Sequence, residues 1–235
     1  MAVTGFAGTE PRAKRSAPQV IIVAFASVSL LLFAPAGRLN WPAAWLWLSL
    51  VFGGALVVLA HVRRRNPGLA ERRLRSGPGT PSWDRIIVTG LRLSFVGVIV
   101  VSALDRGRYG WSSPVWWLSA LGAVLMSSAL VGIGWSMGAN PHFETTVRIQ
   151  GEVGHRVIDR GPYRFVRHPG YVSLALLWLG SALMLGSRWA LIPAGVGVLV
   201  LLLRTALEDR FLNEQLAGYV EYAGRVRYRF VPLLW

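Results

Sequence analysis

Residues 170–207 form one hydrophobic block that is about twice as long as a single membrane span needs, because a helix crosses a bilayer in roughly 20 apolar residues. The only polar break inside the block is Gly186-Ser187-Arg188. A block of this length has to fold back on itself, so the sequence predicts a helical hairpin. Its two spans are expected near 170–186 and 188–207.

Apolar runs of near-bilayer length also precede this block. Hydrophobic residues make up 53% of the 235 positions and charged residues only 15%, which is too apolar for a soluble domain of this length. The runs are 18–36, 42–62, 86–104 and 114–138. The sequence therefore predicts an all-α, polytopic integral membrane protein with about six transmembrane helices. Five spans with a re-entrant hairpin are the main alternative.

Basic residues ahead of the first run, Arg12, Lys14 and Arg15, resemble the start of a signal peptide. A second hydrophobic span follows almost at once, and the distribution of positive charge is compatible with a real first span. We therefore interpret the first run as a retained transmembrane helix.

Positive charge is distributed unevenly across the predicted membrane. With the N-terminus inside, twenty Lys and Arg residues lie on the cytoplasmic side or at its boundary, whereas Arg38, Arg106, Arg108 and Arg188 lie outside. This imbalance predicts that both termini are cytoplasmic. A net charge of +14 would suggest nucleic acid as the partner of a soluble protein. Here the basic loops suit an anionic inner leaflet, so membrane lipids are expected as partners and nucleic acid is not.

Residue usage narrows the chemistry further. An arginine-rich chain with one lysine indicates a high-GC bacterial genome, so we expect a bacterial cell membrane. Cysteine is absent, which excludes disulfides, thiolate metal sites and a cysteine nucleophile. His142, His155 and His168 stand thirteen residues apart without metal-ligand spacing, so no metal site is expected. The sequence does not indicate an oligomeric state.

Polarity divides the chain into three regions. Residues 1–17 are small, polar and basic and are expected to form a disordered cytoplasmic N-terminus. Residues 18–138 hold four transmembrane helices. Residues 139–235 comprise a cytoplasmic loop, the hairpin and a cytoplasmic tail, and the two polar segments can converge on the cytoplasmic mouth of the hairpin to form one site.

Three other features receive structural interpretations. The segment 63–85 carries seven arginines and is interpreted as a solvated loop facing lipid headgroups. The glycines of 132–134 are interpreted as helix-packing positions. An aromatic belt near the outer ends of the spans is predicted for Trp41, Trp45, Trp47, Trp111, Trp116 and Trp117.

The segment GPYRFVRHPGY, residues 161–171, interrupts the apolar runs. Gly161-Pro162 disfavours a smooth helix, and Pro169 forces His168 away from helical backbone angles. Pro169 can then begin the following span, which places Arg167 and His168 at a helix N-terminus that favours an anion. The alternative is an interfacial anchor among lipid headgroups.

A second group of polar residues lies at the inner end of the last span. Arg204 and Glu208 are four residues apart and share a helix face, and charges this close to hydrocarbon are candidates for function. An ion pair between these two residues that caps the span is the alternative.

Together these residues resemble the isoprenylcysteine carboxyl methyltransferase family and its wider relatives, which include phospholipid N-methyltransferases. Members look like Q, a short gap, HxxV, GxY, RHPxY, a hairpin, R-x3-E-[ED]-x2-L and Y-x2-Y. The matching positions are Gln150, His155 to Ile158, Gly161 to Tyr163, Arg167 to Tyr171, Arg204, Glu208, Asp209, Leu212, Tyr219 and Tyr222. The resemblance covers roughly 140–235, and the ordered set is specific although each piece is weak.

The resemblance implies an S-adenosylmethionine-dependent methyltransferase whose catalytic region is 139–235. It implies that Arg204 and Glu208 are catalytic, with Arg204 facing the methyl acceptor. Cofactor-binding residues would be Gln150, His155, Arg156, Val157, Ile158, Tyr163, Arg167, His168, Pro169, Gly170, Tyr171 and Glu208.

The chemistry of a zwitterionic methyl donor fits this assignment. Arg167 and His168 could hold its carboxylate and Glu208 its ammonium group, while Tyr163 and Tyr171 offer ring faces to the adenine or the sulfonium.

The acceptor is left open by departures from the family pattern. The gap from Gln150 to His155 is shorter than in the eukaryotic enzymes, and Asp209 replaces the more usual second glutamate. The expected substrate is a lipophilic or small hydrophobic carboxylate, thiol or amine. Two alternatives are an NADPH-dependent membrane reductase resembling the steroid 5-reductases and a non-catalytic membrane scaffold or transporter.

Overall fold

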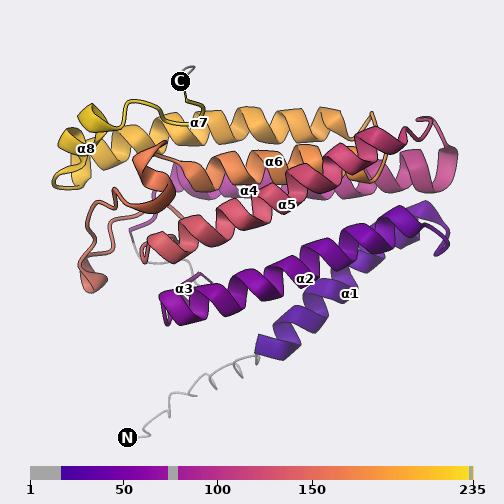
Figure 1. The fold of residues 1–235 in the computed structure, drawn as a ribbon, viewed down its shortest axis with the longest axis horizontal. Coiled ribbons are helices and arrows are strands. Elements are labelled where there is room, and N and C mark those ends of the chain that lie inside the picture. Colours follow the sequence, from indigo (N-terminus) through magenta and orange to yellow (C-terminus); the bar gives the residue numbers. More distant parts are fainter. Residues whose placement is uncertain (1–16, 74–78, 233–234) are drawn as a thin grey trace, which may run out of the picture.

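Helices account for nearly all regular structure in this computed structural model, which describes residues 17–73, 79–232 and 235 (Figure 1). The long apolar helices are α1 (Ala17–Ala36), α2 (Pro42–Arg65), α4 (Ser82–Ser102), α5 (Trp116–Ala139) and α7 (Leu191–Gln215), with a shorter one, α6 (Pro169–Met184). The remaining elements are α3 (Leu69–Arg72), a π-helix η1 (Ala103–Tyr109) that continues α4, two 3-10 turns η2 (Gly151–Val153) and η3 (Gly161–Arg164), and α8 (Tyr219–Arg225). No strand occurs in these described ranges, and the all-α prediction is confirmed.

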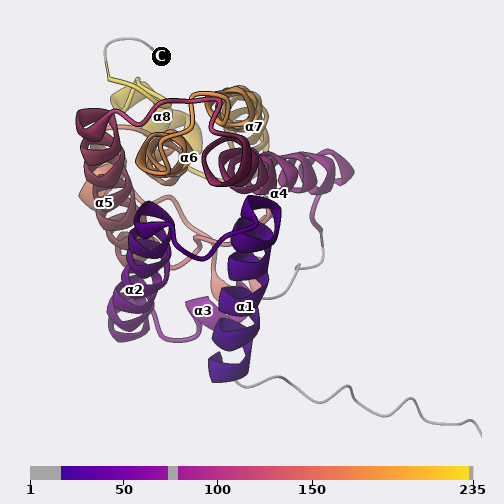
Figure 2. The same ribbon diagram turned by 90° about the vertical axis from the view of Figure 1, so that its right-hand side faces the viewer.

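The long helices form a bundle with two distinct ends. Helices α4, α5, α6 and α7 run side by side, and α1 and α2 lie along one side of them (Figure 1 and Figure 2). We call the end that carries α3, residues 140–168 and α8 the loop-rich end. The opposite end holds only the short connections between helices (Figure 1).

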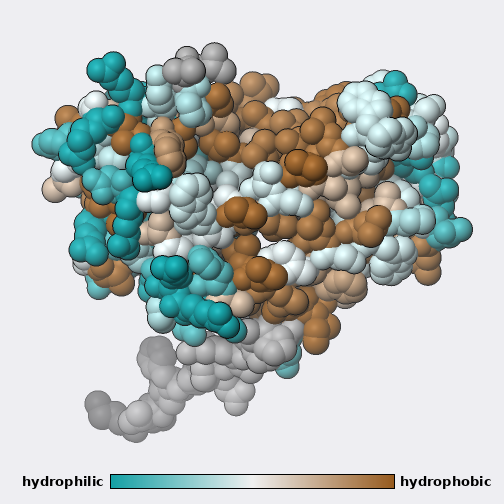
Figure 3. Space-filling model, viewed as in Figure 1, coloured by the Kyte–Doolittle hydropathy of each residue, from teal (hydrophilic) through white to brown (hydrophobic). Residues whose placement is uncertain are grey.

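The surface has the character of a membrane protein. Five helices, including α4 extended by η1, are long and apolar enough to cross a bilayer, and α6 is a 16-residue apolar helix. Figure 3 shows hydrophobic side chains over the middle of the molecule and hydrophilic ones gathered at its two ends. The prediction of a polytopic membrane protein is confirmed.

The predicted hairpin is formed by α6 and α7, and Gly186, Ser187 and Arg188 lie in the turn between them. Its boundaries differ from the prediction because α7 continues to Gln215 instead of ending near 207. Glu208 and Asp209 therefore stand on the helix itself. Their carboxylates bind protein donors from neighbouring loops and helices, so the helix does not have to end where the polar residues begin.

At the opposite end, Asp105 joins the connection between η1 and α5 to the turn between α6 and α7. The buried Asp105 carboxylate accepts hydrogen bonds from the Ser112 N–H at 2.7 Å, the Ser112 hydroxyl at 2.6 Å and the Ser187 hydroxyl at 2.6 Å. Arg38 donates to the Arg106 carbonyl at 2.7 Å at this same end. Residues predicted to lie outside the membrane thus gather at the end away from the loops.

The predicted aromatic belt needs a correction, and the predicted disordered N-terminus lies almost entirely outside the described residues. Trp41 and Trp47 are buried and do not belong to an aromatic belt, because they lie in a core to which α1, α2, α4, α5 and α6 all contribute. Trp45, Trp111, Trp116 and Trp117 are exposed as expected. The predicted disorder of residues 1–16 lies outside the described residues, and Ala17 is already helical.

Close packing of α5 on α6 depends on two glycines. A Cβ atom at Gly122 would come within 2.3 Å of the Met184 nitrogen, and one at Gly180 within 2.8 Å of the Gly122 carbonyl oxygen. The backbones of the two helices therefore touch. Gly132, from the predicted packing motif, likewise lies against the Ser173 side chain of α6.

This contact predicts the effect of one methyl group. Gly122→Ala should lower the free energy of unfolding by about 1–3 kcal/mol, because the new Cβ forces α5 and α6 apart. Gly195→Ala on α7 is the matched control, since nothing lies within 4 Å of its Cβ position. Thermal unfolding of both variants in detergent measures the difference, and equal unfolding midpoints would contradict the contact.

Candidate functional site

The loop-rich end contains a cavity of about 180 Å³. Its walls come from the segment 140–158, from η3, and from the ends of α6 and α7 that meet α8. Lining residues include Arg73, Asn140, His142, Phe143, Glu144, Arg148, Gln150, His155, Arg156, Val157, Ile158, Tyr163, Arg167, His168, Gly170, Tyr171, Arg204, Glu208, Leu212, Tyr219 and Tyr222. Segments far apart in the sequence therefore meet around one space.

Asp209 on α7 holds these walls together. The Arg167 guanidinium lies against both of its carboxylate oxygens, at 2.8 and 2.9 Å, and His168 Nε2 lies 3.4 Å from Oδ1. Tyr219 and Arg229 also donate to the carboxylate, each at 2.9 Å. One buried charge thus joins the segment before α6, helix α8 and the C-terminal tail to α7.

Arg167 carries this connection further. Its Nη1 donates to the carbonyls of Ala223 and Val226 at 3.2 and 3.1 Å, where α8 ends. Its backbone N–H donates to the Tyr228 carbonyl at 2.9 Å, and the backbone N–H of His168 donates to the Arg229 carbonyl at 3.0 Å. Arg167 and His168 were predicted to hold an anionic ligand, but both are engaged by Asp209.

The start of α6 has the geometry that its prolines predict. His168 precedes the helix with φ −123° and ψ 58°, outside the helical region, and Pro169 occupies the first turn. A short 3-10 turn, η3, fills residues 161–164 of the segment expected to be non-helical. Gly170 faces Phe143, where a Cβ would come within 2.4 Å of the ring. The glycine therefore lets loop 140–150 close against the helix.

Arg204 is bound from outside the hairpin. Its Nε donates to Asp84 Oδ1 at 2.9 Å and one Nη donates to the Thr145 carbonyl at 2.8 Å. Asp84, fully buried at the start of α4, also accepts from the Val147 N–H at 2.8 Å. The alternative interpretation of this region, an ion pair between Arg204 and Glu208, is not found among the described residues. Asp84 forms the ion pair with Arg204 instead.

Glu208 is held by an aromatic partner. The Tyr171 hydroxyl donates to its carboxylate, and the Tyr171 ring stacks on His168 with centroids 5.5 Å apart. The Arg204 guanidinium lies 5.2 Å from the same ring. Tyr171 therefore separates the two charged residues that sequence analysis paired.

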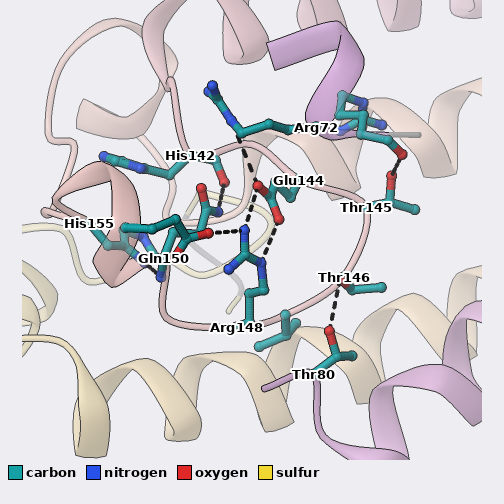
Figure 4. A network of polar contacts seen from close by, with 12 residues as sticks. Arg72, Thr80, His142, Glu144, Thr145, Thr146, Arg148, Gln150 and His155 are labelled. Carbon is teal, nitrogen blue, oxygen red and sulfur yellow. Dashed lines mark hydrogen bonds and ion pairs between the residues drawn. The ribbon is translucent and has the colours of Figure 1, made fainter. Parts of the chain in front are cut away.

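The loop 140–150 has its own polar network (Figure 4). Arg148 donates to both oxygens of Glu144, at 2.8 and 2.9 Å, and Gln150 donates to the His142 carbonyl at 2.7 Å (Figure 4). Arg72 on α3 lies 3.8 Å from Glu144 and donates to the Pro141 carbonyl. The network fixes the loop in front of α3.

Two buried polar atoms at the cavity form no well-aligned hydrogen bond among the described residues, although the Gln150 side chain lies close enough to His142 to oppose the lowering of its pKa. They are Gln150 Oε1 and His142 Nδ1, although Gln150 is only 2% exposed and His142 8%. A buried polar atom without a hydrogen bond is costly. Both atoms belong to residues that line the cavity, so a ligand placed there could satisfy them.

Ionisation of the loop histidines is suppressed by their surroundings. The rings of His142 and His155 lie 4.5 Å apart. Burial, with smaller contributions from neighbouring His142 and Arg148, lowers the pKa of His155 to about 4. Burial also lowers the pKa of His142. Both rings are therefore neutral at pH 7, where they accept as well as donate hydrogen bonds.

Tyrosines from the tail complete the wall. Tyr222 donates to the Tyr163 carbonyl at 2.7 Å, and Asn140 donates to the Tyr163 hydroxyl at 3.2 Å. Burial raises the pKa of Tyr163, Tyr219 and Tyr222. Their hydroxyls therefore remain protonated.

The structure brings almost all of the predicted site residues together. Every one of them lines the cavity except Pro169, which shapes the start of α6. Arg73 and Asp84 were not predicted from the sequence, because both lie within residues 63–85, the segment interpreted as a solvated loop. That interpretation is wrong for Arg72 and Arg73, because both bind the carbonyls of loop 140–150. The one sequence signal that could have indicated Asp84 is an acidic residue at the start of a predicted span.

Comparison with known proteins relates part of the chain to a family. Residues 117–218 match the phospholipid methyltransferase family. This part of the chain is therefore similar to that family. Its matched segment begins at α5 and ends just before α8, so it contains the loop 140–168, the hairpin and Asp209. The recognition of this group from the order of its motifs is confirmed.

Two plant proteins are also similar to part of this chain. One is protein-S-isoprenylcysteine O-methyltransferase B of Arabidopsis thaliana, 29% identical over 120 residues. The other is protein-S-isoprenylcysteine O-methyltransferase A of the same plant, 27% identical over 114 residues. Each alignment covers 47% of this chain, and the chain spans 58% of the length of either relative.

The lowered histidine pKa predicts an acid-sensitive site. Because the pKa of His155 falls from 6.5 unfolded to about 4 folded, the unfolded chain binds more protons between these values. The stability contribution is complete above about pH 6.5 and is lost as pH falls toward 4. His155→Asn, which keeps an acceptor for the Gln150 N–H, should lessen the fall of the unfolding midpoint over this range. Superimposable pH profiles for the two proteins would argue against a neutral buried ring.

Proposed function

We propose that this protein is an integral-membrane S-adenosylmethionine-dependent methyltransferase that acts on a lipophilic or small hydrophobic acceptor. The observation that carries the proposal is the convergence on one cavity of residues that family resemblance assigns to the methyl donor, together with Arg204 and Glu208. The similarity of residues 117–218 to the phospholipid methyltransferase family supports the same reaction class.

The unused polar atoms of the cavity suit the proposed cofactor. Gln150 Oε1 can accept a hydrogen bond, and neutral His142 can accept or donate one at Nδ1. A nucleoside offers both donors and acceptors within one rigid group. We assign its adenosine part to the wall formed by His142, Gln150 and His155 to Ile158.

Charge in the cavity suits the amino-acid part. Glu208 forms no ion pair among the described residues, so its carboxylate is available for an ammonium group. Arg167 and His168 are committed to Asp209. We therefore assign the carboxylate of the cofactor to Arg73 and Arg156, which line the cavity and pair with no carboxylate in the described part of the chain.

S-adenosylmethionine, when bound, supplies a methyl group activated on a sulfonium. The protein's task is then alignment and the exclusion of water. Arg204 is buried and fixed by Asp84 and Thr145, so its orientation is set before an acceptor arrives. We assign to Arg204 the pairing with an anionic acceptor and to Tyr171 the placement of Glu208. Neither role requires proton transfer.

We further propose that the loop-rich end faces the cytoplasm, as the excess of basic residues there indicates. Both termini would then be cytoplasmic and the acceptor would reach the site from the bilayer. A bacterial cell membrane is the location that the residue usage favours. Residues 139–235 would act as the catalytic region on a scaffold of the preceding spans.

Ligand-dependent stability separates this proposal from its alternatives. S-adenosylhomocysteine at about one hundred times its Kd should raise the unfolding midpoint by roughly 5–10 °C in detergent, whereas NADPH should not. A shift with NADPH alone would favour the membrane reductase. An unfolding midpoint that changes with neither ligand would favour a scaffold or transporter. Transfer of tritiated methyl groups to lysed membranes then identifies the acceptor.

Substitutions at the two charged residues should separate turnover from cofactor binding. Arg204→Ala should abolish turnover while S-adenosylhomocysteine still stabilises the protein. Arg204→Lys, which keeps a charge beside Asp84, should lose about 10- to 100-fold in turnover through the lost hydrogen bonds. Glu208→Gln should instead weaken the binding of the cofactor, so S-adenosylhomocysteine should stabilise this variant less than the unchanged protein. Loss of cofactor binding in both Arg204 variants would contradict the assigned role.

A further inference from the structure

A second cavity opens at the loop-rich end between the ends of α2 and α5. Its volume is about 360 Å³. The lining residues are His61, Arg65, Asn66, Trp135, Gly138, Ala139, Arg160 and Gly161. None of them lines the candidate active site, so this cavity is separate.

Positive charge dominates this second cavity. Arg65 and Arg160 flank it and His61 lies beside them, while no acidic residue lines it. Neither arginine forms an ion pair in the described part of the chain. Exposed guanidinium groups without a carboxylate partner can bind a phosphate oxygen pair in a fork geometry.

The frame around these cations is firmly built. The Asn66 side chain donates to the carbonyls of Met137 and Gly138, which joins the end of α2 to the end of α5. A Cβ at Gly138 would come within 2.6 Å of His61 Nε2. At Gly161, where φ is +61°, a Cβ would lie 3.1 Å from Trp135 Nε1. Both glycines therefore leave room for ring nitrogens beside the cavity.

Exposed apolar side chains lie next to the cavity on its membrane side. Val57 on α2 and Val131 on α5 are each 70% exposed, one helical turn deeper in the bundle than His61 and Trp135. The exposed rings of Trp135 and Phe165 meet edge to face at 6.3 Å. Aromatic residues with a polar edge favour the membrane interface. The cations thus stand where the apolar surface of two spans ends.

We propose that this cavity binds the phosphate group of an anionic phospholipid, with acyl chains along the exposed apolar side chains of α2 and α5. A basic pocket between transmembrane helices suits such headgroups. A lipid is favoured over free phosphate because exposed apolar side chains, Val57 and Val131 among them, adjoin the cavity. The site would hold α2 against α5 at the end where the active-site loop begins. It does not depend on the proposed methyltransferase activity.

Short-chain lipids test the proposal on the full chain purified in a neutral detergent. Dihexanoylphosphatidylglycerol should raise the unfolding midpoint in a saturable way, whereas dihexanoylphosphatidylcholine and inorganic phosphate at the same concentrations should not. The double variant Arg65→Gln/Arg160→Gln should bind dihexanoylphosphatidylglycerol at least about tenfold more weakly, since each arginine near an anionic headgroup contributes appreciably.

The matched control is Arg63→Gln/Arg64→Gln, which removes the same charge from exposed positions on α2 outside the cavity. Its affinity should change by less than about twofold if local geometry matters more than general attraction. The unfolding midpoint without lipid reports whether each variant is folded, and Arg160→Gln alone replaces the double variant if that does not fold.

Three results would overturn the proposal. Equal weakening in both double variants would mean diffuse attraction of anionic lipid. Equal stabilisation of the wild-type protein by inorganic phosphate would mean a free anion as the ligand. No stabilisation by dihexanoylphosphatidylglycerol would mean that the cavity does not bind the headgroup.

Discussion

The candidate active-site cavity depends on the set of contacts made by the Asp209 carboxylate. Arg167, His168, Tyr219 and Arg229 all approach it, and its side chain is 2% exposed. A buried carboxylate is strongly unfavourable without compensation. Four partners from three separate segments supply that compensation, so the loop before α6, helix α8 and the tail have to meet at α7.

A second buried charge extends this arrangement beyond the family segment. Asp84 lies outside residues 117–218, yet it binds Arg204 and the Val147 N–H. The N-terminal spans therefore help to form the candidate active site. Through Arg72 and Arg73, the region after α2 also holds the loop that carries Gln150. The second, basic cavity lies where these same spans end.

Much of the fold could be predicted because hydrophobic length is a local property. The block 170–207 required a hairpin, and its polar break marked the turn that separates α6 from α7. The ordered set of short motifs from Gln150 to Tyr222 resembled the isoprenylcysteine methyltransferase group, and residues 117–218 match the related phospholipid methyltransferase family. The ion-pair partners of the charged side chains could not be predicted in the same way. The helix spacing of Arg204 and Glu208 suggested a pair, but Asp84, 120 residues away from Arg204, forms the bond.

The sequence by itself determined the apolar helices, the turn at residues 186–188 and the residue types of the candidate site, because these follow from segment length, proline and charge. The tertiary structure decided which charges are free. Arg167 and His168 are engaged by Asp209, whereas the Glu208 carboxylate accepts a hydrogen bond from Tyr171 and forms no ion pair within the described residues. That difference depends on which segments touch in three dimensions, since a buried charge is compensated by whichever charges or hydrogen-bond donors packing brings to it.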